Sequence, residues 1–127
     1  MSLTNTFETT TLTWLFTTGS ATRPTAWYLG LFTSDPTETG SAGTEVSGGG
    51  YVRKAVTFTV SGNEATNSAA IEWDAATASW GTVTHIAVLD ALTGGNMIAS
   101  NALTTSKAIA TDDIIRVPAG DLDITLD

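Results

Sequence analysis

The sequence contains no cysteine and only one histidine. The absence of cysteine excludes a disulfide scaffold, a thiolate zinc site and a cysteine nucleophile. With a single histidine, a zinc ion would have only carboxylates as its further ligands, which is not a usual zinc ligand set. A chain without cysteine also fits a protein that is assembled in a reducing cytoplasm. We therefore expect neither thiol chemistry nor a zinc-dependent enzyme.

Basic residues are scarce as well, with five Lys and Arg against 13 Asp and Glu and a net charge of −8. Proteins that bind nucleic acid or anionic membranes need clustered Lys and Arg. Only Arg53 and Lys54 are adjacent, and in a strand they would point to opposite faces. No apolar run approaches the ~20 residues that span a bilayer, and Met1–Asn5 lacks the positive charge of a signal peptide. We expect a soluble protein with no nucleic acid and no membrane as partner.

Threonine is the commonest residue type, and only 14% of the residues are charged, against about 25% in ordinary domains. A β-branched side chain with a hydroxyl suits half-exposed strands, so this composition indicates an all-β protein. The length of 127 residues predicts one domain over residues 1–127, large enough to bury its own core.

Alternating apolar residues predict most of the strands. The N-terminal residues are ambiguous, because Leu12, Trp14 and Phe16 alternate as in a strand while Phe7, Trp14 and Leu15 share a helical face. Residue propensity alone favours a strand there, while Gly19–Ser20 is a plausible stop for a short helix. The strands are expected at residues 26–33, 51–60, 69–73, 83–89, 97–103, 114–117 and 122–126, with turns at Ser61–Asn63 and Thr93–Asn96.

About eight short strands with a turn every 8–12 residues, and at most one helix, predict a β-sandwich of jelly-roll type. The strand over residues 26–33 is apolar on both faces, so we expect it to be central. The connection Ser34–Gly50 exceeds the usual loop length, which indicates a functional loop or an ordered contact arm.

Four motifs carry a family resemblance, which covers nearly the whole chain from about Pro24 onward. They are Leu29–Pro36 (LGLFTSDP), Glu45–Arg53 (EVSGGGYVR), Ala76–His85 (ATASWGTVTH) and Ala119–Leu126 (AGDLDITL). In these segments the chain resembles a small structural module of tailed bacteriophages, usually described as a virion structural or tail-fibre-associated protein. The resemblance favours the short N-terminal helix over a strand, so we expect a helix that Gly19–Ser20 ends. It implies a virion component that is made in the host cytoplasm. It also implies other virion proteins of the capsid or tail as partners, and either homo-oligomers or subunits bound in a lattice.

Large aromatic and apolar residues give the candidate interface. The N-terminal segment, about residues 1–20, holds more of them than a terminal arm needs, so we expect it to be an attachment segment. Tryptophan and tyrosine are also enriched in interface hot spots and can stack on sugars. Trp27 and Trp73 alternate with aliphatic residues and are expected in the core. The candidate interface residues are Phe7, Trp14, Phe16, Tyr51 and Trp80.

Catalytic and phosphate-binding patterns are weak. The lone histidine, His85, lies within a predicted strand, and the chain has no G-x-S-x-G nucleophile elbow. Gly48–Gly50 is followed by a predicted strand instead of a helix, so we expect it to allow close packing, not to bind phosphate. We expect no catalytic site and no cofactor.

Clustered carboxylates leave two alternatives open. Glu72 and Asp74 are the right residue types for a glycosidase pair, although a solvated strand end explains them more simply. Asp121, Asp123 and Asp127 are expected on the outer face of the last strand, where the alternative to a solvated face is a weak calcium site.

The function indicated by the sequence is a non-enzymatic virion structural protein, most simply a capsid decoration or cement subunit, because the chain shows no fibre-forming repeat or coiled coil. The alternatives are a tail-fibre or baseplate module that contacts the host surface, and a carbohydrate-binding β-sandwich in which Tyr51 or Trp80 stacks on sugar rings. A glycan hydrolase is a third alternative.

Overall fold

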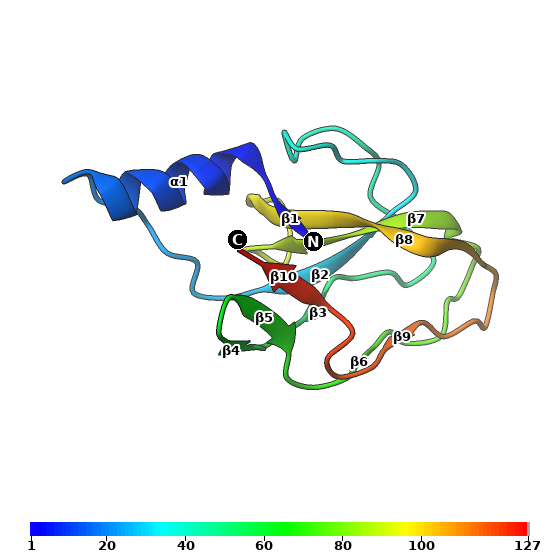
Figure 1. Ribbon diagram of the computed structural model, residues 1–127. Helices are drawn as coiled ribbons and strands as arrows, with labels where there is room; N and C mark the ends of the chain where they lie inside the picture. The colour runs from blue at the N-terminus through cyan, green and yellow to red at the C-terminus, as the bar shows by residue number, and fades with distance from the viewer. Residues whose placement is uncertain (127) are drawn as a thin grey trace.

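A five-stranded antiparallel sheet forms one side of the molecule. The computed structural model describes residues 1–126, and its longest strands, β7 (Gly81–Leu89) and β8 (Met97–Ile109), pair with each other in this sheet (Figure 1). The sheet has the strand order β1–β8–β7–β2–β3. Its other strands are β1 (Ser2–Leu3), β2 (Tyr28–Phe32) and β3 (Lys54–Ala55).

Two smaller antiparallel sheets face this one across the core (Figure 1). The three-stranded sheet has the order β10–β5–β4, and a two-stranded sheet pairs β6 with β9. Their strands are β4 (Phe58–Ser61), β5 (Glu64–Asn67), β6 (Ile71–Glu72), β9 (Arg116–Val117) and β10 (Asp123–Thr125).

The main core lies between these layers, on one face of β2. Leu29 and Leu31 are fully buried there, while Phe32 points to the opposite face of the sheet. β2 lies between β7 and β3, so the prediction of a central strand is confirmed. Trp73 is also buried in the core as predicted, and its indole N–H donates a 2.9 Å hydrogen bond to the carbonyl of Val52.

A second, smaller apolar cluster on the outer face of the sheet is covered by the long connection after β2. The cluster consists of Phe32, Ala87, Leu89 and Met97. The connection folds over its own sheet, where Pro36 is fully buried. The predicted irregular loop over residues 34–50 is confirmed, apart from one isolated bridge between Glu45 and Phe32.

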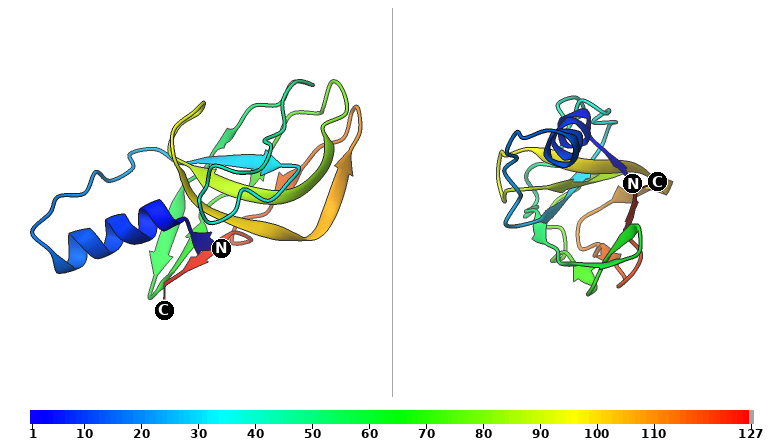
Figure 2. Two further views of the ribbon diagram at one scale, coloured as in Figure 1. Left: turned by 90° about the horizontal axis from the view of Figure 1, so that it is seen from above. Right: turned by 60° about the vertical axis from the view of Figure 1, so that its left-hand side comes forward.

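The helix α1 (Asn5–Phe16) is anchored at one end only. The Thr4 hydroxyl donates a 2.8 Å hydrogen bond to the Met97 carbonyl, and the Thr4 amide donates to the Ile98 carbonyl, so the N-cap residue ties the helix to β8. From there α1 extends away from the sheets (Figure 2), and none of its side chains is buried. The predicted helix is confirmed, but it ends at Phe16, before the predicted stop at Gly19–Ser20.

The expected strand over residues 51–60 is wrong. The chain instead forms β3 and β4, which belong to different sheets, so the apolar residues do not share one buried face. Val56 is buried, whereas Val52 and Val60 are 52% and 72% exposed. The polar strand β5 was not predicted, because its sequence Glu-Ala-Thr-Asn carries no apolar alternation.

The prediction of an all-β protein with one short helix is confirmed. The described residues form ten strands in sheets of five, three and two, so an eight-stranded jelly roll is not confirmed. Two tight antiparallel hairpins are β4–β5 around Gly62 and β7–β8 around Gly94 and Gly95, and these three glycines have positive φ. These two hairpin turns lie where the sequence places them.

Asn67 in β5 holds the C-terminal segment in place. It is buried, its amide donates 2.9 Å hydrogen bonds to the carbonyls of Ala69 and Pro118, and its side-chain oxygen accepts one from the Leu122 amide. Asn67→Ala should lower the free energy of unfolding by about 2–3 kcal/mol, because it leaves buried backbone groups unpaired. Chemical denaturation measures this. Asn63→Ala, which removes one exposed bond to the Leu126 carbonyl, is the control and should cost less than about 1 kcal/mol. Equal losses for the two variants would contradict the role of Asn67.

Candidate interaction site

The end of α1 presents a group of large apolar side chains that nothing in the described chain covers. Leu12, Trp14, Leu15 and Phe16 are 58%, 63%, 54% and 77% exposed. Successive helix residues are about 100° apart, so Leu12, Leu15 and Phe16 lie within about 100° of one another and Trp14 lies on nearly the opposite side. Large apolar side chains that gather on a surface usually mark a contact with a partner. This apolar helix end, residues Leu12–Phe16, therefore exposes apolar surface that a partner would normally cover.

The sequence of α1 gives the helix little stability of its own. Five of its 12 residues are threonines, which have low helix propensity. The hydroxyls of Thr10 and Thr11 donate to the carbonyls of Thr6 and Phe7, four residues earlier, a bond that slightly weakens helices. Isolated helices of this length are marginal in water. Packing against another surface would supply the missing stabilisation.

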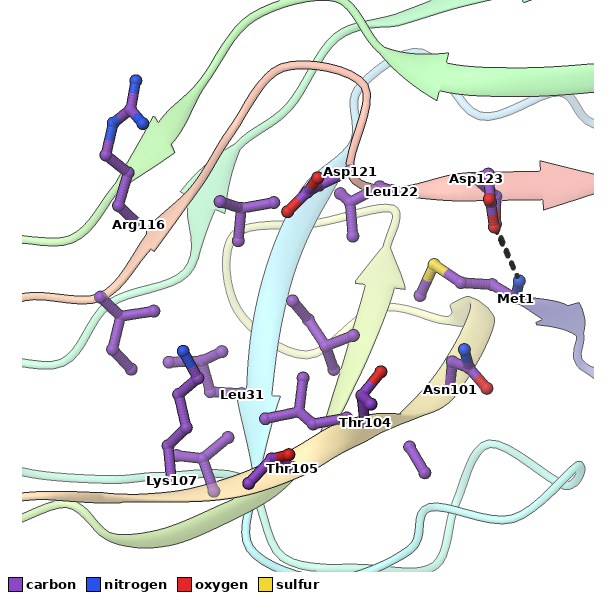
Figure 3. Close-up of a pocket in the computed structure, with 16 residues that line it drawn as sticks. Met1, Leu31, Asn101, Thr104, Thr105, Lys107, Arg116, Asp121, Leu122 and Asp123 are labelled. Carbon is purple, nitrogen blue, oxygen red and sulfur yellow. Dashed lines mark hydrogen bonds and ion pairs between the residues drawn. The ribbon is translucent and has the colours of Figure 1, made fainter.

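A groove of about 450 Å³ opens between β8 and the segment that carries β9 and β10 (Figure 3). Buried apolar residues form its floor, and polar side chains surround the opening. The floor includes Leu31, Val83, Ile86 and Leu122. The rim includes Asn101, Thr104, Lys107, Arg116, Asp121 and Asp123. The groove can accept apolar side chains at its floor while its rim provides hydrogen-bonding groups.

The groove exists because β8 is only partly paired. β1 pairs with Ala99 and Ser100 alone, so the outer edge of β8 beyond Ser100 has no partner strand among the described residues. On the inner edge of β8, Val83 of β7 pairs with Lys107 and His85 pairs with Ala102. The segment of β8 between these two pairs is longer than the facing segment of β7, so β8 bulges here. Such a bulge bends the strand and redirects its side chains. The bent edge therefore leaves the space in front of the core open.

An ion pair anchors the long connection to the rest of the fold. The Arg53 guanidinium donates to both carboxylate oxygens of Glu45, at 2.9 and 2.8 Å, and also to the carbonyls of Ala91 and Gly94 in the β7–β8 turn. The Tyr51 hydroxyl donates a 2.7 Å hydrogen bond to Glu45 and accepts one from the amide of β2. This network, Glu45–Tyr51–Arg53, joins three separate segments at one edge of the main sheet.

The environment of the network shifts the pKa values of all three groups. Burial raises the pKa of Glu45, but hydrogen bonds from Arg53 and Tyr51 outweigh burial and hold it below its ordinary value of 4.5. Burial, followed by the bond to Glu45, raises the pKa of Tyr51, so its hydroxyl stays protonated. The hydrogen bond to Glu45 raises the pKa of Arg53. The network is therefore an ionised pair with a neutral phenol.

The structure separates the five predicted interface residues into two groups. Trp14 and Phe16 are exposed at the apolar helix end, and Phe7 is half-buried against the core. Tyr51 is half-buried and packs edge-on against Trp80, with 5.4 Å between the ring centroids. Trp80 is only 5% exposed, and its indole N–H donates to the Gly49 carbonyl. The idea that Trp80 is an exposed anchor, or stacks on sugars, is therefore wrong.

Trp80 is buried because Gly48–Gly50 lets the backbone approach it. All three glycines have positive φ, and a Cβ on Gly49 would lie 2.8 Å from the Trp80 ring. The expectation of close packing at this segment is confirmed. The Ser-Trp-Gly context of Trp80 gave no sign of this contact, because the covering residues lie about 30 positions earlier in the chain.

His85 lies next to two groups that a catalytic site would use, but their geometry does not form one. Its Nδ1 is 2.8 Å from the Thr84 hydroxyl, and its Nε2 is 3.7 Å from Asp35, longer than a hydrogen bond. The same Asp35 oxygen accepts a 2.8 Å bond from the Thr37 amide, which closes a turn. Asp35 therefore stabilises the turn in the loop and does not orient the His85 imidazole.

The predicted carboxylate pair Glu72 and Asp74 lies on the surface. Glu72 is 3.8 Å from Arg116, and Asp74 is 3.8 Å from Lys54, so each carboxylate has its own cation. Neither lines the groove.

The predicted aspartate cluster is only partly described. Asp127 lies outside the described residues, Asp121 precedes β10, and Asp123 lies on it. Within residues 1–126, no group of three or more acidic or histidine side chains is arranged to hold a metal ion. In the same range, no helix combines the length and hydropathy needed to cross a membrane.

The pKa of Glu45 predicts how stability depends on pH. Because its pKa is lower in the folded state than the ordinary 4.5, its stabilisation is complete above pH 4.5 and is lost as the pH falls through the folded-state value. Glu45→Gln should lower the free energy of unfolding at neutral pH by about 2 kcal/mol and remove this part of the acid sensitivity. Urea denaturation across a pH series measures both effects. Glu38→Gln, in the exposed part of the same loop, is the control, and an acid sensitivity unchanged in Glu45→Gln would contradict the assignment.

The contact between Gly49 and Trp80 can be tested with a matched pair of variants. Gly49→Ala and Gly48→Ala both place a side chain at positive φ, but a Cβ on Gly48 meets nothing within 4 Å. Backbone strain alone should cost about 1 kcal/mol in each. Gly49→Ala should lose about 1–3 kcal/mol more, because Trp80 must move. Thermal and chemical denaturation give the difference, and equal losses would show that Gly49 is not needed for the packing of Trp80.

The geometry thus leaves an uncovered apolar helix end and an open groove as the features that can bind a partner. A comparison with curated proteins found no match. A comparison with protein families matched residues 2–125 to the family described as podophage GP4 fiber I protein gp80. Because the match covers nearly the whole chain, the chain belongs to this family and is a tail-fibre-related structural protein of a phage virion.

Proposed function

We propose that this chain is a non-enzymatic subunit of a phage tail fibre and that α1 is the element through which it joins its neighbours. The observation that carries the proposal is the apolar helix end, which exposes four large apolar side chains on a helix with no buried residue. Exposed patches of this kind mark interaction surfaces in soluble proteins. The partners are other proteins of the virion, and the subunit is made in the host cytoplasm.

The family is described as a fiber I protein, which supports a place in the tail fibre over a place on the capsid surface. The argument for a capsid decoration subunit was the absence of a fibre repeat or a coiled coil. The absence of a repeat or coiled coil no longer favours the capsid, because a family named for a fibre matches almost the entire chain. The hypothesis of a tail-fibre subunit is therefore better supported than the hypothesis of a capsid decoration subunit.

The alternatives that require a ligand or a reaction find little support. The carbohydrate-binding alternative relied on Tyr51 or Trp80 as the stacking ring, but Trp80 is buried and the Tyr51 hydroxyl is bonded to Glu45. A glycan hydrolase needs a poised acid and a poised base, but Glu72 and Asp74 are surface ion-pair partners.

The charge distribution suits a subunit that approaches its neighbours through α1. The chain carries a net charge of −8, so two acidic bodies repel each other at long range. Glu8 is the single charged residue of α1. A contact made through α1 therefore avoids most of this repulsion and depends on apolar burial.

Substitution of the apolar helix end tests this role. Leu12→Ser, Trp14→Ser and Phe16→Ser combined should leave the melting temperature unchanged within a few degrees, because none of these side chains is buried. The variant should lose most of its incorporation into particles, which gel densitometry of purified particles measures. These substitutions are cleaner than deleting residues 1–18, because a deletion would also remove β1 and the Thr4 anchor.

Val60→Ser is the matched control, since Val60 is 72% exposed on β4, far from α1 in the chain. The wild-type contact should also survive about 1 M salt, because screening at that strength removes only exposed electrostatic contacts. Normal incorporation of the triple variant would refute α1 as the attachment element. Release of the wild-type subunit by moderate salt would show that charged residues carry the contact instead.

A further inference from the structure

We infer that the partner of α1 is a second copy of this chain, whose groove between β8 and the β9–β10 segment receives the apolar helix end. The inference rests on the proposed function, in which α1 is the assembly element, and it names the surface that α1 occupies. The result is a head-to-tail contact in which each copy offers a helix on one side and a groove on the other.

The apolar helix end and the groove are complementary in what they leave uncovered. The helix end has four large apolar side chains and no cover, while the groove has an apolar floor and nothing that fills it. A volume of about 450 Å³ has room for roughly two of the large side chains of α1 at protein packing density. The polar rim of Asn101 and Thr104 can bond to the threonine hydroxyls of the same helix.

A helix cannot fill the groove of its own chain. α1 leaves β1 toward one end of the molecule, whereas the free part of β8 and β9 lie toward the other end (Figures 1 and 2). Thr4 fixes the start of α1 to β8, so the helix cannot swing round without breaking two hydrogen bonds. The contact must therefore join two molecules.

The charge around the groove fits a second copy. Lys107, Arg116 and the Met1 ammonium line the groove together with Asp121 and Asp123, and the ammonium lies 3.8 Å from the Asp123 carboxylate. The lining therefore carries no net negative charge, so an acidic second copy is not repelled there.

A contact between two α1 helices satisfies the observations less well. Side-by-side helices bury one face each, so Trp14, which lies nearly opposite Leu12 and Phe16, would stay exposed. Insertion into a concave surface covers more than one face. Because the helix and the groove are different surfaces, the contact is heterologous, and such contacts build closed rings or open filaments.

Mixing two defective variants tests the inference. The helix variant carries Trp14→Ser and Phe16→Ser, and the groove variant carries Thr104→Trp, which fills the groove from an exposed position on β8. Sedimentation velocity across a concentration series should show self-association of the wild type and at least tenfold weaker association of each variant alone. An equimolar mixture should form a dimer and nothing larger, because one intact helix and one intact groove remain in each pair.

Two controls show that the variants are folded and specific. Thr82→Trp places the same side chain on the exposed part of β7, away from the groove lining, and Val60→Ser removes an exposed apolar side chain from β4. Both should associate like the wild type, and all variants should keep the circular dichroism spectrum and melting temperature of a folded domain.

The other outcomes overturn the inference in distinguishable ways. If the helix variant loses association while Thr104→Trp keeps it, α1 contacts a different surface of the second copy, and the proposed function stands. If the wild type stays monomeric but the helix variant is lost from particles, the partner is another virion protein, and again only the inference fails. If the wild type is monomeric and the helix variant is incorporated normally, both the inference and the proposed function fail.

Discussion

The ion pair between Glu45 and Arg53 is the constraint on which the long connection between β2 and β3 depends. This connection contains no regular strand, and its backbone pairs with the β2 segment only around the isolated bridge between Glu45 and Phe32. Arg53 instead bonds Glu45 and the β7–β8 turn, and Tyr51 bonds Glu45 and the amide of Leu31. Removing one member of such a half-buried set leaves the others unpaired, which is costly. The same segment carries the glycines that bury Trp80, so one network positions the loop and closes the core.

Sequence patterns predicted those parts of the fold that depend on local periodicity and turn chemistry. The central strand over residues 26–33 and the hairpin turn at Thr93–Asn96 follow from the spacing of apolar residues and glycines. The N-terminal helix does not, because the spacing also fits a strand and the family resemblance decided between the two. The break between β3 and β4 does not, because it is set by which sheet each half pairs with. β5 was missed for the same reason, since a polar strand is recognised by its partners and not by its own residues.

The candidate site also has features that the sequence indicated and features that it did not. Trp14 and Phe16 were recognisable because the helix has more apolar residues than one buried face can use. The burial of Trp80 was not, because it depends on a glycine about 30 positions earlier in the chain. No sequence signal indicated the groove, which arises from a bulge in β8 and from the short reach of β1. Both features are properties of strand pairing, which single residues do not reveal.

The fold combines a well-fixed body with a helix that depends on its surroundings. In the described residues, every buried side-chain nitrogen and oxygen has a hydrogen-bond partner, so the groove belongs to a rigid framework. α1 buries no side chain and is rich in threonine, so its helical state gains stability only from contact with another surface. Binding must then supply the free energy that orders the helix, which lowers the affinity for a given buried area. A subunit built in this way associates weakly as a pair and firmly only where several contacts form together, as they do in a fibre.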